Sequence, residues 1–455
     1  MTRKEKRDRI EKINFFEEFL KIQNHFFKEL VNKLKHVKDE RNQSYITYPP
    51  EVLLFMIIMK NSCGIVSMND MTNKFNKENC ISNIFKSLKI ESIEEIPHYD
   101  TINNFLKALE PTELEKIIKY MVKELLNKRC LEKYRLRNKY WKIAIDATGI
   151  FSFKHKHCEH CLKRVYKNKE TGEIERIEYY HNVLEAKLIV GDMVISIATE
   201  FIENEKEDVE KQDCELNAFK RLEKRLKKEY KRLPICILAD SLYANKSVFE
   251  ICKNNRWQYI IRFKEGSIKS VAEEFNVISK LEDNNDNIVT NQKVDKINNK
   301  EVIKDTKYIY VNSIDYDKFK LNEVEYTNEY KDNNKIKEEK FVFITSIELT
   351  KSNIKELVEA GRSRWKIENI GFNNQKNGNY DIEHVCCLNY NAMKNHYLLV
   401  QITDIIKQLF ERGCSRIKEL KFSKKNISSI LKNSFGQETI LKDIIFNSHI
   451  KIRDI

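Results

Sequence analysis

The stretch WKIAIDATG, residues Trp141–Gly149, decides the fold of this chain, because a short apolar run in it leads directly into an acid, Asp146. A second run of the same kind, ICILAD, spans Ile235–Asp240. Short apolar runs that are rich in Ile and bounded by polar residues are typical of buried β-strands. We therefore expect both runs to be strands of one sheet, with an aspartate at the end of each.

The segments around these two runs predict a mixed sheet with helices packed on it. Two strand-like segments flank the hairpin signal Gly191-Asp192, and a long basic helical segment follows them. The order strand, hairpin, helix, strand, helix, strand is typical of an α/β fold, and the two strands that lead into the aspartates can be neighbours in it. The expected ranges are Trp141–Ile145, Tyr179–Val190, Met193–Ile202, Cys214–Leu233, Ile235–Ala239, Ser247–Asn254 and Trp257–Phe263.

A third acid, Glu368, lies in a helical segment four residues after Arg364, so these two side chains are expected on one helix face. Rigid carboxylates on strand ends and helix faces can hold divalent cations for phosphodiester chemistry. Each acid also has an ordinary structural explanation: Asp146 as a turn cap, Asp240 as a helix N-cap, and Glu368 as the partner of Arg364. The three acids in this order on one scaffold favour a metal-dependent nucleic-acid enzyme.

Residues 1–135 have helical periodicity, with helix starts expected at Pro50 and at Asp100 or Thr101. We interpret this part as a helical N-terminal domain that binds DNA, and a plain helical cap is the alternative. The sequence thus predicts an α/β protein with a helical domain ahead of its sheet.

The remaining ranges complete the expected domain organisation. Residues 136–265 and 341–410 form the core, in which Asn353 is expected to cap a helix that runs to the region of Phe372. Residues 266–340 are polar and Asn-rich and predict an inserted, partly β subdomain, with a disordered linker as the alternative for Glu282–Lys300. Residues 411–455 predict a basic helical tail.

Charge favours a polyanionic partner. The net charge is +13 and the pI is about 9.0. Basic residues cluster in Lys128–Lys142, in Lys220–Arg232 and in the tail from Ser415, where they resemble a track for phosphates, although each run could instead be a solvated helix face. DNA is therefore the expected partner.

The sequence predicts a cytoplasmic protein. It has no apolar stretch of about 18 residues, the length of a membrane span, and no secretory core follows the basic start Met1–Lys6. Eleven scattered cysteines, an odd number, favour reduced thiols over a disulfide framework. No membrane partner is expected.

A second cluster of chemistry-bearing residues stands just after Asp146, a placement that suggests the ordering of a loop near the active site rather than catalysis. Cys158 and Cys161 have the spacing of a zinc knuckle, but no second pair of this kind completes a ligand set. The further ligands of a structural Zn²⁺ would come from His155, His157 or His160, or from Cys386 and Cys387 beside His384. The alternative is a polar loop with chance cysteines, and a catalytic cysteine is not favoured because no oxyanion motif accompanies it.

The ordered set of motifs resembles the DDE transposases of bacterial insertion sequences, within the ribonuclease H-like superfamily. The closest likeness is to the cut-and-paste group with a β-rich insertion between its second and third acids, and it covers residues 95–410. The motifs that carry it are Ile145-Asp146-Ala147-Thr148-Gly149, Glu185-Ala186-Lys187-Leu188, Ala239-Asp240-Ser241-Leu242-Tyr243 and Arg364-Trp365-Lys366-Ile367-Glu368-Asn369, extended by Phe372 and Lys376.

The resemblance implies a ribonuclease H-like mixed sheet flanked by helices and a site for two Mg²⁺ ions, with Mn²⁺ as a substitute. Asp146, Asp240 and Glu368 would hold these ions and catalyse cleavage of the element ends and their joining to target DNA. The implied assembly is a homodimer that pairs two ends. Arg364 is the expected phosphate contact, with weaker expectations for Arg362, Lys366 and Lys376; Trp365 is interpreted as a core aromatic, with base stacking as the alternative.

The chain departs from the Tyr–Arg–Glu–Lys signature of that group. Gly361 stands at the Tyr position and Gln375 at the Lys position, with Lys376 one residue later. This puts in doubt the contacts that the Tyr and Lys make with DNA ends. Two other functions stay open: a non-catalytic DNA-binding protein derived from a transposase, with a zinc-stabilised Cys/His loop, and a nuclease without strand transfer.

Overall fold

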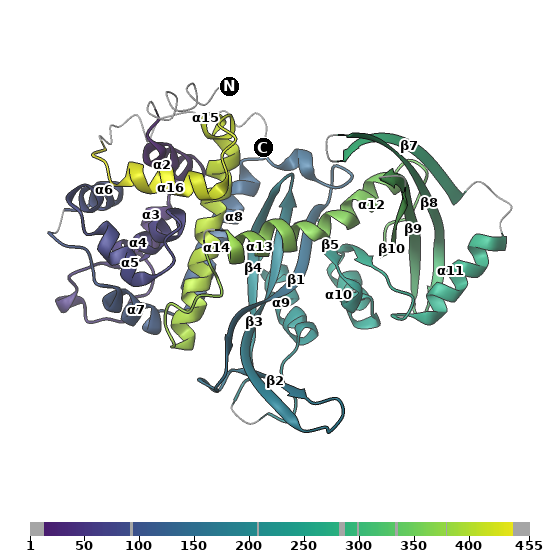
Figure 1. Cartoon of the computed structure of the whole chain (residues 1–455), viewed down its shortest axis with the longest axis horizontal. Coiled ribbons are helices and arrows are strands. Elements are labelled where there is room, and N and C mark those ends of the chain that lie inside the picture. Colours follow the sequence, from purple (N-terminus) through teal and green to yellow (C-terminus); the bar gives the residue numbers. More distant parts are fainter. Residues whose placement is uncertain are drawn as a thin grey trace.

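The computed structural model describes residues 13–91, 94–206, 209–281, 287–297, 300–332, 335–378 and 380–439. In this part of the chain a layer of helices packs beside a large mixed sheet, which continues into a curved β-rich end (Figure 1). Within the same ranges, none of the helices combines the length and the apolar composition that a bilayer crossing needs. The start of the chain, Met1–Lys6, lies outside the described residues.

The N-terminal helices surround one helix that has no exposed face. Every residue of α4 is buried, and Pro50 occupies its first turn as predicted, where a missing N–H costs no hydrogen bond. The helices of this part are α2 (Phe15–Phe26), α3 (Leu30–Lys35), α4 (Pro50–Ser62), α5 (Met68–Phe75), α6 (Glu78–Leu88), α7 (Tyr99–Ala108) and α8 (Pro111–Asn127), with short 3₁₀ turns at Gln43–Tyr45 and Glu132–Tyr134.

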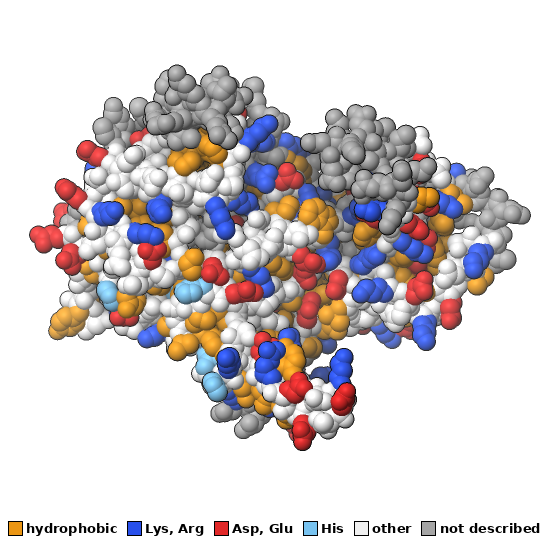
Figure 2. All heavy atoms as spheres, in the orientation of Figure 1, with side chains coloured by type: hydrophobic (Ala, Val, Ile, Leu, Met, Phe, Trp, Pro, Cys, Tyr) orange, Lys and Arg blue, Asp and Glu red, His pale blue; other side chains and the backbone are white. Residues whose placement is uncertain are grey.

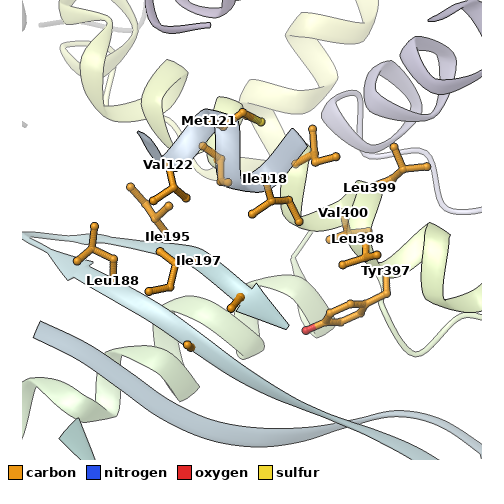
Figure 3. Packing of buried hydrophobic residues seen from close by; sticks show 14 of the residues in the cluster. Ile118, Met121, Val122, Leu188, Ile195, Ile197, Tyr397, Leu398, Leu399 and Val400 are labelled. Atoms are coloured by element: carbon orange, nitrogen blue, oxygen red, sulfur yellow. The ribbon is translucent and has the colours of Figure 1, made fainter. Parts of the chain in front are cut away.

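The long helix α14 (Tyr390–Gly413) ties this helical layer to the sheet, because it packs against α2, α4, α7, α8 and the strand β4. Figure 3 shows Ile118, Met121 and Val122 of α8 facing apolar side chains of the sheet, with α14 alongside. The shorter helices α15 (Ser415–Lys418) and α16 (Lys424–Phe435) follow, and α16 packs on α2, α4 and α6. Residues 440–455 of the predicted basic tail lie outside the described residues.

The sheet has the strand order β2-β3-β1-β5-β6-β10-β9-β8-β7, and β4 pairs with β3. β1 is antiparallel to β3 and parallel to β5, and β5 is parallel to β6. The two strands that lead into the aspartates are therefore neighbours, as predicted. The strands are β1 (Trp141–Phe153), β2 (Leu162–Lys167), β3 (Ile174–Val190), β4 (Met193–Ile202), β5 (Ile235–Ala239), β6 (Gln258–Arg262), β7 (Ile288–Ile297), β8 (Lys300–Tyr316), β9 (Phe319–Asp332) and β10 (Lys335–Thr345).

The polar segment after β6 forms a helix and four antiparallel strands. α11 (Lys269–Leu281) packs on β8, and the strands β7 to β10 continue the sheet because β10 pairs with β6. The linker alternative is wrong for the described residues of Glu282–Lys300, since β7 occupies most of them; residues 282–286 and 298–299 are outside the description. The domain boundaries given above remain predictions.

Helices cover both faces of the central strands. On one face α9 (Glu215–Glu229) packs on β3 and β4 through Phe219 and Leu222, and α10 (Lys246–Asn255) packs on β6. On the other face α12 (Ile354–Arg362) contacts β5, β6 and β9. A 3₁₀ turn (Ser363–Trp365), a π-helical segment (Ile367–Phe372) and α13 (Asn373–Asn377) follow α12 and cross the sheet over β1 and β4.

Two local predictions were wrong, and a third was right in position only. β1 does not end at Ile145 but runs on to Phe153, because its outer half pairs with β3 across a bulge between Gly149 and Phe151. α7 is capped by His98, whose side chain accepts from the Asp100 N–H, rather than by Asp100 or Thr101. Asn353 occupies the N-cap position of α12 as predicted, but its side chain makes no cap bond, because its amide bonds the backbone of the preceding loop instead.

Candidate active site

The register of β1 and β5 brings two of the predicted acids side by side. Ala144 is paired with Leu238, so the same offset places Asp146 level with Asp240 just beyond the paired residues. Neighbouring strands lie about 4.8 Å apart, which puts the two aspartates in adjacent positions. Asp240 directly follows β5, and its carboxylate accepts from the Leu242 N–H at 2.9 Å, so it also caps the 3₁₀ turn Ser241–Tyr243. Asp240 can therefore be explained as the cap of this turn, as a member of the acidic site, or as both.

Arg364 connects the third acid to the first. Its guanidinium lies 3.3 Å from the Asp146 carboxylate (Nη1–Oδ2) and 2.6 Å from the Glu368 carboxylate (Nη2–Oε1). The predicted sharing of a face by Arg364 and Glu368 is thus confirmed, although the segment between them is 3₁₀ and π rather than α. A π-helical segment inside a helix is frequently found at functional sites.

The acidic site, formed by Asp146, Asp240, Glu368 and Glu215, carries more negative charge than Arg364 balances. Burial, together with the charges of Glu368, Glu215 and Asp240, raises the pKa of Asp146 to about 7, while Arg364 acts in the opposite direction. Four carboxyl groups therefore influence one another around a single guanidinium. Such a site favours a cation, because a cation relieves both the repulsion and the desolvation of the carboxylates.

Glu215 was missed by the sequence reasoning. It begins α9, accepts from the buried Tyr243 hydroxyl at 2.7 Å, and has a raised pKa because it is buried and lies near Asp240. Nothing in the local sequence distinguishes it from the other acids of a charged helix. The one available signal was its place in the first turn of the helix that follows the hairpin, ahead of the second acidic strand.

The chemistry of the donor set fits a hard divalent cation, since Asp146, Asp240 and Glu368 offer carboxylate oxygens alone. In the described part of the chain, these oxygens do not form a group in which all ligand atoms lie within 4.8 Å of one another. Arg364 pairs with Asp146 and with Glu368, and its positive charge offsets part of their negative charge. The assignment of these acids as ligands remains a prediction.

All four predicted DNA-contacting cations have partners within the chain. Beyond the Arg364 pairs, Arg362 bonds the Tyr326 hydroxyl at 3.2 Å, Lys366 donates to the Gly191 carbonyl at 2.8 Å, and Lys376 pairs with Glu383 at 2.7 Å. Figure 2 shows acidic side chains near the middle of this face, with Lys and Arg beside them over α12 and the neighbouring strands. Their contacts with DNA remain a prediction.

The interpretation of Trp365 as a core aromatic was wrong. The residue is 46% exposed, because the 3₁₀ turn directs it away from the sheet while Ile367 becomes the buried residue. It stands next to Arg364 in the chain, beside the residue that pairs with Asp146 and Glu368. An exposed tryptophan at such a place is available for stacking on a base.

The two positions that depart from the signature are both packed inside the molecule. Gly361 lies against the sheet, where a β-carbon would come within 2.8 Å of Phe343 and 2.9 Å of Ile260. Gln375 is fully buried and donates to Gln401 and Asp404 at 3.0 Å each. Neither position can therefore present a side chain to DNA in this structure.

We expect Gly361→Ala to lower the free energy of unfolding by about 1–3 kcal/mol, because an added methyl overpacks a close contact between helix and sheet. Helix propensity alone predicts the opposite sign, a gain of about 1 kcal/mol. Thermal unfolding of the two proteins decides between them. Gly266→Ala is the control, since no atom lies within 4 Å of its β-carbon position; a Gly361→Ala protein as stable as the parent would contradict the tight packing.

Two arginines of the basic run Lys220–Arg232, which was predicted to contact phosphates, form ion pairs within the chain instead. Arg221 binds Glu200 at 2.6 Å and Asp213 at 2.7 Å, and Arg225 binds Glu115 at 2.6 Å and Glu200 at 2.9 Å. These two arginines fasten α9 to β4 and α8. The clustering of basic residues in this run therefore has a structural cause as well as a possible electrostatic one.

A buried polar layer supports the segment that carries Glu368. Glu185, paired with Asp146 across β1 and β3, is fully buried and accepts from the hydroxyls of Ser196 and Thr199 at 2.5 Å and of Tyr397 at 3.1 Å. Lys187 is buried beside it, 3.9 Å away, and donates to Gln401 at 3.1 Å. Its ammonium also lies 5.2 Å from the Phe372 ring centre, directly under the π-helical segment.

The Cys/His loop after β1 is brought together with a residue that the sequence reasoning missed. His157, Cys158 and Cys161 gather with His181 of β3. His155 is exposed and outside this group, and His160 turns away to bond the Asn204 carbonyl at 2.8 Å. The distant candidates Cys386, Cys387 and His384 are not members of the group.

Comparisons with known families agree with the geometry. Residues 209–403 match the family model described as "Transposase DDE domain", and residues 31–121 match the model described as "DDE_Tnp_1-associated". Among curated proteins, none matches the chain. The first match includes Asp240 and Glu368 but begins after Asp146, whose place beside them comes from the strand register. The predicted α/β fold of the ribonuclease H-like class and the resemblance stated above are thereby confirmed.

Proposed function

We propose that this chain, which belongs to the DDE transposases of the insertion-sequence type, cuts the ends of its element and joins them to target DNA at one acidic site. Asp146, Asp240 and Glu368 are the proposed catalytic residues. The observation that carries the proposal is that Arg364 pairs with both Asp146 and Glu368, while burial, and after it the charges of Glu368, Glu215 and Asp240, raises the pKa of Asp146 to about 7. Carboxylates held close together repel one another and destabilise the fold, and a bound cation removes this repulsion.

Two divalent cations, Mg²⁺ or in its place Mn²⁺, held by Asp146, Asp240 and Glu368 would activate the attacking oxygen and neutralise charge on the leaving oxygen. The chain itself holds the acids in place. β1 fixes Asp146, the Leu242 N–H orients the Asp240 carboxylate, and Arg364 orients Glu368. Rigid placement of this kind contributes to catalysis by lowering the cost of assembling the reacting groups.

Arg364 and Trp365 are the proposed contacts with the DNA end. Arg364 makes two charge-assisted bonds to carboxylates, and its planar guanidinium can serve a phosphate in the same way. Trp365 presents an exposed ring beside it for stacking on an unpaired base. We also propose that two copies of the chain act together, each holding one element end.

The test is an end-cleavage assay with the purified full-length chain and DNA that carries the terminal inverted repeats flanking its gene. The expected result is Mg²⁺-dependent cleavage at the repeat boundary, followed by joining of the freed 3′ ends to a second DNA. Cleavage without joining would identify a nuclease instead. Binding of the repeats without cleavage in Mg²⁺ or Mn²⁺ would identify a non-catalytic DNA-binding protein and overturn the proposal.

The affinity for Mg²⁺ is expected to rise with pH. Asp146 is largely protonated below about pH 7, and a carboxyl must lose its proton to bind a cation. The dissociation constant should therefore be about tenfold larger at pH 6 than at pH 8, with little change above that. Calorimetric titration at several pH values measures it. A dissociation constant that stays the same from pH 6 to pH 8 would contradict the raised pKa of Asp146. In Asp146→Asn the dissociation constant should change little with pH, because the titrating carboxyl is gone.

A further inference from the structure

Four metal-binding atoms converge outside the acidic site. The loop between β1 and β2 supplies His157, Cys158 and Cys161, and β3 supplies His181. The Cys158 and Cys161 sulfurs lie 3.4 Å apart, His157 Nδ1 lies 3.2 Å from the Cys161 sulfur, and His181 Nε2 lies 3.4 Å and 3.6 Å from the Cys158 and Cys161 sulfurs. All four ligand atoms lie within 4.8 Å of one another.

These separations suit a tetrahedral zinc ion. With Zn–S near 2.3 Å and Zn–N near 2.05 Å, the edges of a tetrahedron are about 3.3–3.8 Å long. Of the separations in the structure, 3.4 Å, 3.4 Å and 3.6 Å lie within this range and 3.2 Å lies just below it. Two thiols and two imidazoles form a complete ligand set with no open position, which is typical of a structural rather than a catalytic zinc.

The surroundings of the two imidazoles also indicate a ligand. His181 is fully buried and stacks on Tyr390, with ring centres 4.3 Å apart, and His157 lies against Phe153 at 3.9 Å. The outer ring nitrogens, His157 Nε2 and His181 Nδ1, are buried without hydrogen-bond partners. The other nitrogen of each ring, His157 Nδ1 or His181 Nε2, faces the two sulfurs at 3.2–3.6 Å. Each imidazole can therefore give one nitrogen to a metal in the cluster.

The position in the fold suggests what such an ion does. The outer half of β1 and the β2–β3 hairpin project from the body of the molecule (Figure 1). The cluster joins the loop that leads into β2 to the middle of β3, at the base of this projection, and His181 pairs with Phe151 across the sheet. Asp146 lies five residues before Phe151 along β1, which is about 17 Å at roughly 3.3 Å per residue. An ion at the cluster would thus fix the hairpin without taking part in chemistry at the acids.

We propose that His157, Cys158, Cys161 and His181 bind one structural Zn²⁺ that fastens the β2–β3 hairpin to the catalytic sheet. The ligand set keeps three of the residues expected from the sequence, excludes His155 and His160, and adds His181. The zinc proposal does not depend on the acids, so a failed test of the proposed function would leave it unaffected. It also does not require that the chain be active.

The test is the metal content of the purified full-length protein, measured by mass spectrometry of the metal, with cobalt substitution as a second readout. One zinc per chain is expected in the parent and in His155→Gln, an exposed neighbour that serves as the matched control. Cys161→Ser and His181→Gln should each lose the zinc. With Co²⁺, the parent should show the absorption of a tetrahedral thiolate site, and Cys158→Ser should lose it as Cys161→Ser does.

The cobalt spectrum of the parent keeps the proposal testable if the ligand variants fail to fold, because it needs no substitution. A parent that binds neither zinc nor cobalt, or one in which Cys158 and Cys161 form a disulfide under reducing purification, would overturn the proposal. So would zinc that remains at one per chain in folded Cys161→Ser. Loss of zinc from His155→Gln to the same extent as from His181→Gln would point to an adventitious ion.

Discussion

Asp240→Asn is expected to lower the rate of DNA-end cleavage by at least about 10³-fold while leaving binding of the DNA end unchanged, because removal of one catalytic carboxylate costs several kcal/mol of transition-state stabilisation. Asparagine is chosen because it caps a helical turn as well as aspartate does, so the bond from the Leu242 N–H can persist. The substitution therefore separates the proposed catalytic role from the structural one. Single-turnover cleavage of a labelled end measures the effect.

Glu368→Gln should give a loss of similar size, since glutamine can still bond Arg364 but carries no charge. Asp315→Asn, at an exposed ion pair with Lys320 on the insertion, is the matched control and should cleave at the parental rate. If Asp240→Asn cleaves normally and melts at the parental temperature, Asp240 acts only as a cap. Asp240 would then not be a catalytic residue, although the chain would still belong to the transposase family.

Lys187→Met is expected to lower the free energy of unfolding by about 3–5 kcal/mol, the usual cost of removing one partner of a buried charge pair. Lys187 and Glu185 are both fully buried, and burial lowers the pKa of the lysine and raises that of the glutamate. Methionine keeps the length and packing of the side chain under Phe372. The loss would therefore report the uncompensated charge of Glu185, and thermal unfolding measures it.

The double variant Glu185→Gln with Lys187→Met should recover much of this loss, because it leaves no unpaired buried charge. Lys246→Met removes a lysine from an exposed pair with Asp317 and should leave the melting temperature unchanged. If Lys187→Met is as stable as the parent, the ion pair contributes nothing to the layer beneath Glu368. If the double variant is less stable than Lys187→Met, the hydrogen bonds of Glu185 matter more than its charge.

Local patterns in the sequence predicted the positions of most strands and helices. The hairpin at Gly191 is one case: its φ of +59° suits glycine, β4 has the predicted bounds, and β3 ends at the predicted Val190 although it begins earlier, at Ile174. The length of β1 was underestimated because its outer half, past Gly149, is held by pairing with β3 and not by an apolar run of its own. Hydrogen bonds to a distant strand leave no local signal.

The sequence by itself determined the α/β class and the pairing of Arg364 with Glu368, because each follows from a period or a short spacing along the chain. It allowed the two acidic strands to be neighbours, and the pairing of β1 with β5 made them so. Only the tertiary structure decided that Glu215 joins the acids, that His181 completes the Cys/His group, and that Trp365 is exposed. These three depend on side chains that meet across elements far apart in sequence, or on a helix that changes from 3₁₀ to π. Such meetings are fixed by how the elements pack, and packing is a property of the whole fold rather than of any one segment.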